Sequence, residues 1–207
     1  MKLLLNSRRQ RNCTLAFEDG QAIYKITTPF KVTGRVTTIL RVVSSAKDEH
    51  NDADLDSRLQ DKFAHLAEIE WQYIKSSRLR FRGDDIDMGT LFRKFGLGPY
   101  GRHRAFTAPD GREYVWKMGM WASEVCPAVN VTAGEINYAL FQLYLNDDSI
   151  PKKPLIAKYH RPTFNPIGPN KPGYLEISPE GEPILDDIVV TFVIVETYRK
   201  ERERASR

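Results

Sequence analysis

The residue types that most often carry out chemistry are few in this chain and lie far apart in its sequence. The chain holds four histidines and two cysteines, which are His50, His65, His103, His160, Cys13 and Cys126. No cysteine or paired carboxylate stands at the spacing from these histidines that a zinc site or a facial triad needs. Neither cysteine belongs to a Cys-x-x-Cys pattern. We therefore expect no metal site, no cofactor and no catalytic thiol.

Two pairs of neighbouring carboxylates are the next candidates, because two acids held together can split their pKa values for acid–base work. Asp84-Asp85 and Asp147-Asp148 both lie in turn-like surroundings, which favours solvated acids. The glycine-rich stretch 96–101 lacks the strand, lysine and helix of a phosphate loop. The sequence thus nominates no catalytic residue, and an enzyme of unrecognised type stays an alternative.

Basic residues give the one functional signal. The predicted site residues are Arg102, Arg104, Arg112 and Lys117 around one expected hairpin, and Lys152, Lys153, Lys158, His160 and Arg161 around another. Two neighbouring hairpins could form one cationic face that holds phosphate head groups. The competing interpretation is a set of solvated charges, partly balanced by Glu113, Asp147 and Asp148.

Turn chemistry and alternation place these residues on β-strands. Pro109-Asp110-Gly111 predicts a tight turn within 104–118, because proline fixes φ, aspartate bonds the local backbone and glycine accepts a positive φ. Asp19-Gly20 predicts another within 14–27. The remaining expected strands are 36–43, 66–71, 78–82, 138–145, 155–160 and 173–178, with a short helical turn at 90–95.

One apolar run near the end of the chain is expected to form the core against which the predicted strands pack. Residues 188–195 carry no charge, whereas Asp186 and Asp187 precede them and Arg199, Lys200 and Arg202 follow. Acids before bases complement a helix dipole, and a helix that is apolar all round must be buried. We predict a central helix over 185–203. The alternative is a sandwich in which 188–195 is a central strand, since valine and isoleucine favour strands.

Composition fits one domain over residues 1–207. The chain is 41% hydrophobic, so a packed core is expected. Its formal charge of +4 fits weak attraction to anionic surfaces but is also common in proteins that bind nothing acidic. We expect a basic N-terminal tail at 1–12 and a polar insertion at 46–62. The apolar run spans only ~12 Å as a helix, against a hydrocarbon layer of ~30 Å, so no transmembrane span is expected. Two cysteines and no signal peptide favour an intracellular, cytoplasmic protein.

Many antiparallel strands followed by one apolar helix suggest a closed or nearly closed sheet around that helix, which would remove exposed strand edges. In this order the segments 106–117, 157–161 and 185–193 resemble a family of unknown function found widely in mushroom-forming fungi. Residues 24–29 and 66–71 fit the same pattern, and the layout is similar to the tubby-like superfamily, which includes scramblases and LURP-one-related plant proteins. The resemblance implies a mainly β fold: a single antiparallel barrel of about twelve strands that encloses a hydrophobic C-terminal α-helix. Residues 46–62 and 120–137 depart from it as insertions.

These observations favour a non-enzymatic binding module. We expect it to dock through its outer barrel face on phosphoinositide or another anionic lipid, or on a protein partner, and to lie peripherally at membranes. Tubby domains bind phosphoinositides, but their ligand residues do not align with positions of this chain. The alternatives are a scramblase-like lipid-handling protein and an enzyme. The basic termini are interrupted by Glu201 and Glu203, so no specific nucleic-acid partner is expected.

Overall fold

The computed structural model describes residues 1–7, 12–30, 34–43, 63–72, 76–98, 101–118, 139–162 and 171–205. The expected insertions at 46–62 and 120–137 lie outside these residues. The strands are β1 (Lys2–Leu5), β2 (Cys13–Ala16), β3 (Ala22–Thr27), β4 (Arg35–Val42), β5 (Phe63–Trp71), β6 (Arg78–Phe81), β7 (Asp84–Asp87), β8 (Arg93–Gly98), β9 (Gly101–Thr107), β10 (Glu113–Met118), β11 (Ala139–Leu145), β12 (Leu155–His160) and β13 (Tyr174–Ile177). The helices are α1 (Met88–Leu91), the 3₁₀ turn η1 (Pro179–Ile184) and α2 (Leu185–Ala205).

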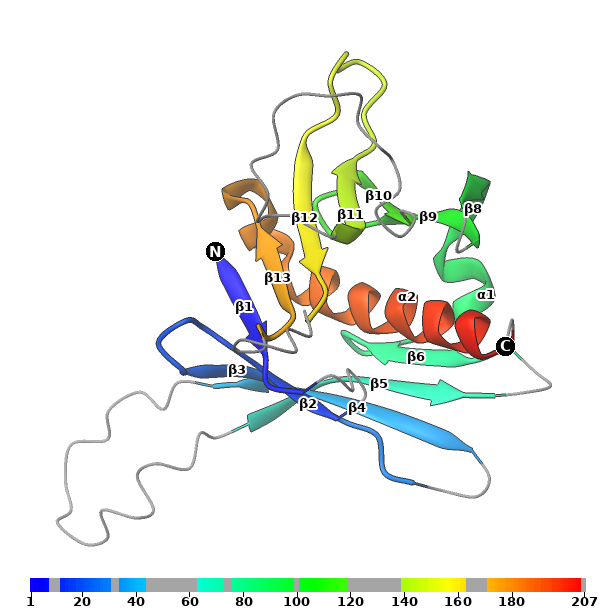
Figure 1. Ribbon diagram of the computed structural model, residues 1–207. Helices are drawn as coiled ribbons and strands as arrows, with labels where there is room; N and C mark the ends of the chain where they lie inside the picture. The colour runs from blue at the N-terminus through cyan, green and yellow to red at the C-terminus, as the bar shows by residue number, and fades with distance from the viewer. Residues whose placement is uncertain are drawn as a thin grey trace, which may run out of the picture.

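All thirteen strands of the described residues belong to one antiparallel sheet, in the order β7-β6-β5-β4-β3-β2-β1-β13-β12-β11-β10-β9-β8. The mainly β class is confirmed, but the sheet is not closed: β7 and β8 are its two edges, and α1 connects them in sequence. The sheet curves so strongly that β2–β6 lie on one side of α2 and β9–β12 on the other (Figure 1). The helix therefore fills the concave side of an open sheet.

The predicted hairpins form where turn chemistry is strongest. In the β9–β10 turn, Asp110 accepts a hydrogen bond from the Arg112 backbone at 3.0 Å and Gly111 takes φ 75°. In the β2–β3 turn, Asp19 accepts from the Gln21 backbone at 2.9 Å and Gly20 takes φ 89°. Glycine is the residue that adopts such angles without a steric penalty, so both turns follow directly from local sequence.

The apolar run is a helix and not a strand. Residues 188–195 are all buried within α2. At its first turn Asp186 accepts from the Tyr24 hydroxyl at 2.6 Å, and Asp187 accepts from Arg82 at 2.6 Å. These carboxylates stand at the positive end of the helix dipole, as the charge order predicts. No helix in the described part of the chain is long and apolar enough to cross a membrane.

Both halves of the sheet hold α2 with aromatic and polar contacts. From β10, the Trp116 indole nitrogen donates to the Thr191 hydroxyl at 2.9 Å. From β12, the Tyr159 ring lies 4.7 Å from that of Phe192, measured between centroids. From β5, Trp71 meets Tyr198 edge-on at 6.0 Å. The helix is thus fixed along its length and on opposite sides.

Several segments differ from the prediction. Asp84-Asp85, expected in turn-like surroundings, belongs to the edge strand β7, where it pairs in register with Phe81 and Arg80 of β6. Residues 2–5, expected in a basic tail, form β1 between β2 and β13, because Leu3 and Leu5 are buried in the core. The helical turn expected at 90–95 lies earlier, at Met88–Leu91, where Asp87 caps it by accepting from the Gly89 backbone at 2.6 Å. Residues 93–98 form the edge strand β8, with Gly96 at φ 61° where its pairing with β9 is irregular.

Candidate anion-binding surfaces

The nine predicted site residues fall into three separate places. Arg112, Lys152 and Lys153 lie on the β9–β10 and β11–β12 turns. Lys117, Lys158 and His160 lie on the outer face of the sheet. Arg102, Arg104 and Arg161 lie at the other ends of β9 and β12, near the C-terminal part of α2. The hairpins are neighbours, but they do not gather all nine side chains into one face.

The turn residues are surrounded by acids. Lys153 donates to Asp148 at 2.9 Å and also to Asn146. Asp147 accepts from the backbone and hydroxyl of Ser149, and these bonds, helped by Arg112 and Lys153, hold the pKa of that carboxyl below its usual range. The charges of this place largely cancel, so it is a poor site for an anion.

Three hydrogen-bond donors form a row across neighbouring strands of the outer face. Lys117 pairs in register with Gln142, and Gln142 with Lys158. We call Lys117, Gln142 and Lys158 the donor row. Neither ammonium group forms an ion pair with a residue that the structure describes. Adjacent strands lie ~4.8 Å apart, so the Cα atoms of the two lysines are separated by ~10 Å.

Tyr144 contacts two members of the donor row, Gln142 and Lys117. Its hydroxyl donates to Gln142 Oε1 at 2.8 Å, and its ring lies 4.5 Å beneath the Lys117 ammonium. Burial raises the pKa of Tyr144, which keeps the phenol protonated. Since Tyr144 occupies the acceptor atom of Gln142, the amide nitrogen is left to donate.

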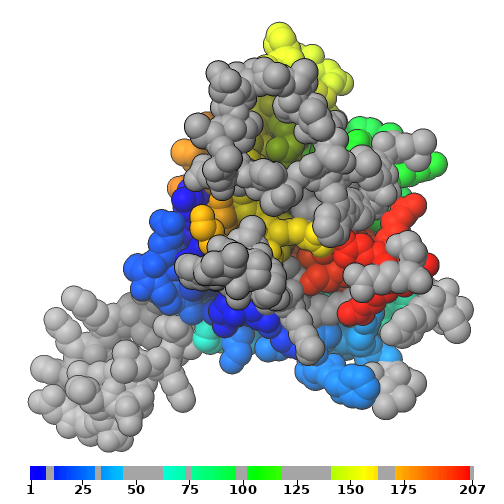
Figure 2. Space-filling view, viewed as in Figure 1, coloured from blue at the N-terminus to red at the C-terminus, as the bar shows by residue number. Residues whose placement is uncertain are grey.

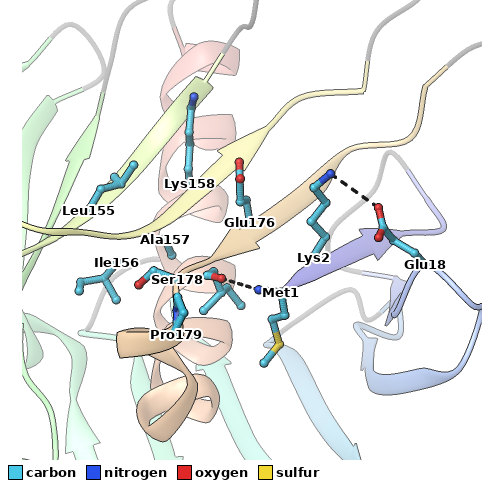
Figure 3. Close-up of a pocket in the computed structure, with 11 residues that line it drawn as sticks. Met1, Lys2, Glu18, Leu155, Ile156, Ala157, Lys158, Glu176, Ser178 and Pro179 are labelled. Atoms are coloured by element: carbon cyan, nitrogen blue, oxygen red, sulfur yellow. Dashed lines mark hydrogen bonds and ion pairs between the residues drawn. The ribbon is translucent and has the colours of Figure 1, made fainter.

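A groove of about 580 Å³ adjoins the far end of the row (Figure 3). Lys158, Glu176 and Lys2 follow one another across β12, β13 and β1, and their side chains leave the sheet on the same side. Lys2 also lies 3.7 Å from Glu18. On the groove side, Lys158 and Lys2 each have a carboxylate neighbour, Glu176 and Glu18, which makes the groove a poor site for an anion. On the other side, the neighbours that follow Lys158 in register are Gln142 and Lys117, which carry no negative charge.

His160 is enclosed rather than presented. Its ring stacks on Tyr174 with 4.1 Å between centroids, and its Nε2 lies 3.0 Å from Glu176. Burial lowers the pKa of His160, although the Glu176 carboxylate acts against this shift. The imidazole is thus neutral at pH 7 and adds no positive charge to the outer face.

Arg104 does not lie on the outer face of the sheet; its side chain points inward, toward α2. It pairs in register with the buried Trp116, and its guanidinium lies 4.3 Å from the Tyr198 ring of α2. Burial lowers the pKa of Arg104, and the nearby charge of Arg202 adds to this. The residue stabilises the packing of β9 against the helix.

Exposed cations surround the C-terminal end of α2. We call Arg102, Lys171, Arg202 and Arg204 the basic end; all four are exposed, and none forms an ion pair with a described residue. Arg202 and Arg204 are on α2 itself. Arg102 is two residues from Arg104, which contacts Tyr198 of α2, and Lys171 is two residues from Gly173, which lies against Pro162 next to Arg161. The carboxylates at this end are already paired, Glu201 with Arg35 at 2.8 Å and Glu203 with Arg161 at 3.3 Å. The terminal residues of α2 reach the molecular surface (Figure 2). Positive charge is therefore left uncompensated here.

An aromatic side chain is exposed close by in the connection between β3 and β4. Phe30 is 93% exposed, and this connection ends at Arg35, which pairs with Glu201 of α2. Val43, at the other end of β4, is 49% exposed. The ring of Phe30 is therefore available for contact with an apolar partner, and burying it there would be favourable.

Comparison with known proteins assigns the chain to a family. A family model described as a family of unknown function, DUF6593, matches residues 8–201. The chain belongs to the DUF6593 family. No curated protein and no solved structure matches it. The function of this DUF6593 chain must therefore be argued from its surfaces.

Sequence reasoning missed part of the basic end. Lys171 of the DUF6593 chain was not considered, and Arg202 was considered only as part of a basic terminus, because the contact of Arg161 with Glu203 that brings the end of β12 to α2 is made by the fold. Alternation could have signalled that Arg104 faces inward, because Phe106 shares its strand face. No group of three or more potential metal ligands exists among the described residues. Burial raises the pKa of Cys13 to about 12, so this thiol stays protonated and unreactive at neutral pH.

Proposed function

We propose that this chain is a non-enzymatic binding module that docks on anionic lipid surfaces through its basic end. The observation that carries the proposal is the gathering of Arg102, Lys171, Arg202 and Arg204, without ion-pair partners among the described residues, around the end of α2. Each lysine or arginine near an anionic membrane contributes about 1 kcal/mol to binding. The lipid-binding surface that we propose is thus the basic end, and not the outer face of the two hairpins that the sequence suggested.

Phe30 adds an apolar contact to the same docking mode. Peripheral proteins combine basic side chains with aromatic groups that enter the headgroup boundary. The 93% exposure of Phe30 gives this chain such a group near Arg35 and Glu201. Similarity to the tubby-like superfamily, and an intracellular place at membranes, agree with this function and are part of the proposal.

Sedimentation with vesicles tests the proposal. The chain should bind vesicles of phosphatidylcholine with phosphatidylserine, bind pure phosphatidylcholine weakly, and lose affinity as salt screens the charges. The double variant Arg202→Ala/Arg204→Ala should bind roughly 30-fold more weakly, from two lost charges at about 1 kcal/mol each. Phe30→Ser should lose about tenfold.

Matched variants separate this surface from general effects. Arg112→Ala/Lys152→Ala removes two exposed cations from the turns, and Val43→Ser removes an exposed apolar group at the other end of β4. Both should bind like the wild type. Equal binding to neutral and anionic vesicles, or equal losses in both double variants, would overturn the proposal.

A further inference from the structure

The donor row presents only hydrogen-bond donors to the outside. Lys117 and Lys158 offer ammonium groups, and the Gln142 amide nitrogen has no acceptor among the residues that the structure describes. A row of donors without an acceptor is satisfied by water or by an oxyanion. The two lysines flank the amide from the strands on either side, so their four-carbon stems can converge above it.

Tyr144 gives this row a fixed geometry. The Tyr144 hydroxyl orients the Gln142 amide by donating a hydrogen bond to Gln142 Oε1 at 2.8 Å. The Lys117 ammonium lies 4.5 Å from the centroid of the Tyr144 ring. Solvated surface lysines without such support pay side-chain entropy when they bind a ligand. Here part of that ordering exists before any ligand arrives, which favours a specific contact.

We propose that Lys117, Gln142 and Lys158 form an oxyanion site on the outer face of the sheet, suited to a diphosphate or to two neighbouring phosphate groups. Two ammonium groups and one amide match a ligand whose charge is spread over several oxygens. A single carboxylate would use one lysine alone. The site goes beyond the proposed function, because it shares no residue with the basic end.

The neighbours of the row limit where the ligand lies. On one side Glu176 pairs in register with Lys158 and repels an anion. On the other side His103 lies near Lys117, and burial together with the Lys117 charge lowers the pKa of its imidazole, so that it is neutral at pH 7. The positive charge of the site is therefore that of Lys117 and Lys158, on either side of the neutral Gln142 amide.

Calorimetric titration of the full chain with inorganic pyrophosphate tests the site. Pyrophosphate should bind more tightly than orthophosphate. Lys117→Ala and Lys158→Ala should each weaken binding about tenfold, as expected for the loss of one charge-assisted hydrogen bond. Gln142→Glu keeps the shape but places a carboxylate between the lysines, and it should abolish binding.

Tyr144→Phe tests the positioning role, since it keeps the ring under Lys117 but loses the hydroxyl that orients Gln142. We expect a several-fold loss of pyrophosphate affinity with an unchanged denaturation midpoint. Lys152→Ala is the matched control and should bind pyrophosphate normally. Undetectable pyrophosphate binding by the wild type, or normal binding by Gln142→Glu, would overturn the inference for a soluble ligand.

Vesicles with phosphatidic acid form the second arm, because the phosphate could be carried by a lipid. If Gln142→Glu weakens binding to these vesicles but not to phosphatidylserine vesicles, while pyrophosphate does not bind, the oxyanion site takes a lipid-borne phosphate. If neither arm responds to Gln142→Glu, the site is refuted. Arg202→Ala/Arg204→Ala should leave pyrophosphate binding unchanged, so this result is independent of the docking proposal.

Discussion

His160 occupies a position where burial and charge act on its proton in opposite directions. The ring is 4% exposed and stacks on Tyr174, which disfavours the charged imidazolium. Glu176 favours it through its contact with Nε2, while Lys158 and Lys2 oppose it. Burial is the largest of these effects, so the pKa of His160 in the folded chain lies below its ordinary value of 6.5.

This shift predicts a loss of stability on mild acidification. Between the folded pKa and 6.5 the unfolded chain binds more protons than the folded chain, so the free energy of unfolding falls as pH decreases through that window. We expect the urea midpoint of the wild type to decrease between pH 7.5 and 5.5. His160→Gln should show a smaller decrease, whereas His65→Gln, at an exposed position, should behave like the wild type. An equal decrease in all three proteins would contradict the prediction.

Residue types alone located cations but not their environments. Lys117 and Lys158 were expected near one another, and their registers with Gln142 place them on the two strands that flank β11. Arg104 could not be separated from them by charge, because its contact with Tyr198 depends on a helix that lies far away in sequence. A side chain's partners are set by tertiary packing, which spacing within a hairpin does not encode.

At the level of elements, α2 carries a buried ion pair in its second half. Arg199 donates through Nε and Nη2 to the two carboxylate oxygens of Glu196, at 2.7 and 2.8 Å, and also bonds Glu203. Glu196 is 1% exposed and Arg199 2% exposed. A charge so enclosed is tolerated only while its partner is present.

Arg199→Met should therefore destabilise the chain more than an ordinary surface change. We expect a loss of about 3–5 kcal/mol in the free energy of unfolding, because the buried Glu196 then keeps, among the described residues, a single ion-pair partner, Lys200 at 3.6 Å. Glu196→Gln/Arg199→Met should lose clearly less than Arg199→Met alone. Arg202→Met, on the exposed side of the helix, is the control. Urea denaturation of the wild type and the three variants gives the free energies of unfolding. If Glu196→Gln/Arg199→Met is as unstable as Arg199→Met, the unpaired Glu196 charge is not the cause of the loss.

Elements with strong local signals were predictable and weak ones were not. The β2–β3 and β9–β10 hairpins follow from Asp-Gly turns, and α2 follows from its length, its flanking charges and the absence of glycine and proline. β1 was missed because only four residues form it and its burial depends on pairing with β13, far along the chain. β8 was missed because Gly96 and Gly98 lower strand propensity.

The whole molecule is a sheet that wraps a helix without closing. Its two edges, β7 and β8, have one ladder neighbour each among the described strands, whereas every other strand has two. The prediction of a closed or nearly closed sheet followed from the many strands, the apolar helix and the general cost of open edges, and the barrel of about twelve strands followed from the family resemblance. Here β7 is only four residues long and carries three aspartates, which discourages pairing with another chain. The β7 edge of the open sheet is thus disfavoured as a template for another strand.

This arrangement predicts a gradient of backbone protection across the molecule. The amides of residues 188–195 lie in a helix whose residues are buried by strands on both sides, so their exchange requires global unfolding. The amides of β7 and β8 should exchange through local opening, at a free-energy cost well below the global value of about 5–15 kcal/mol. Hydrogen exchange at increasing sub-denaturing urea distinguishes the two, because only global opening depends steeply on urea. β11 and β12 each have a neighbouring strand on both sides and serve as the internal reference. The protection of their amides should be equal to that of α2 or lie between α2 and the edge strands. If the α2 amides exchange as fast as those of β7, the helix is not enclosed by the sheet, and the surfaces assigned to the basic end and the donor row would have to be drawn again.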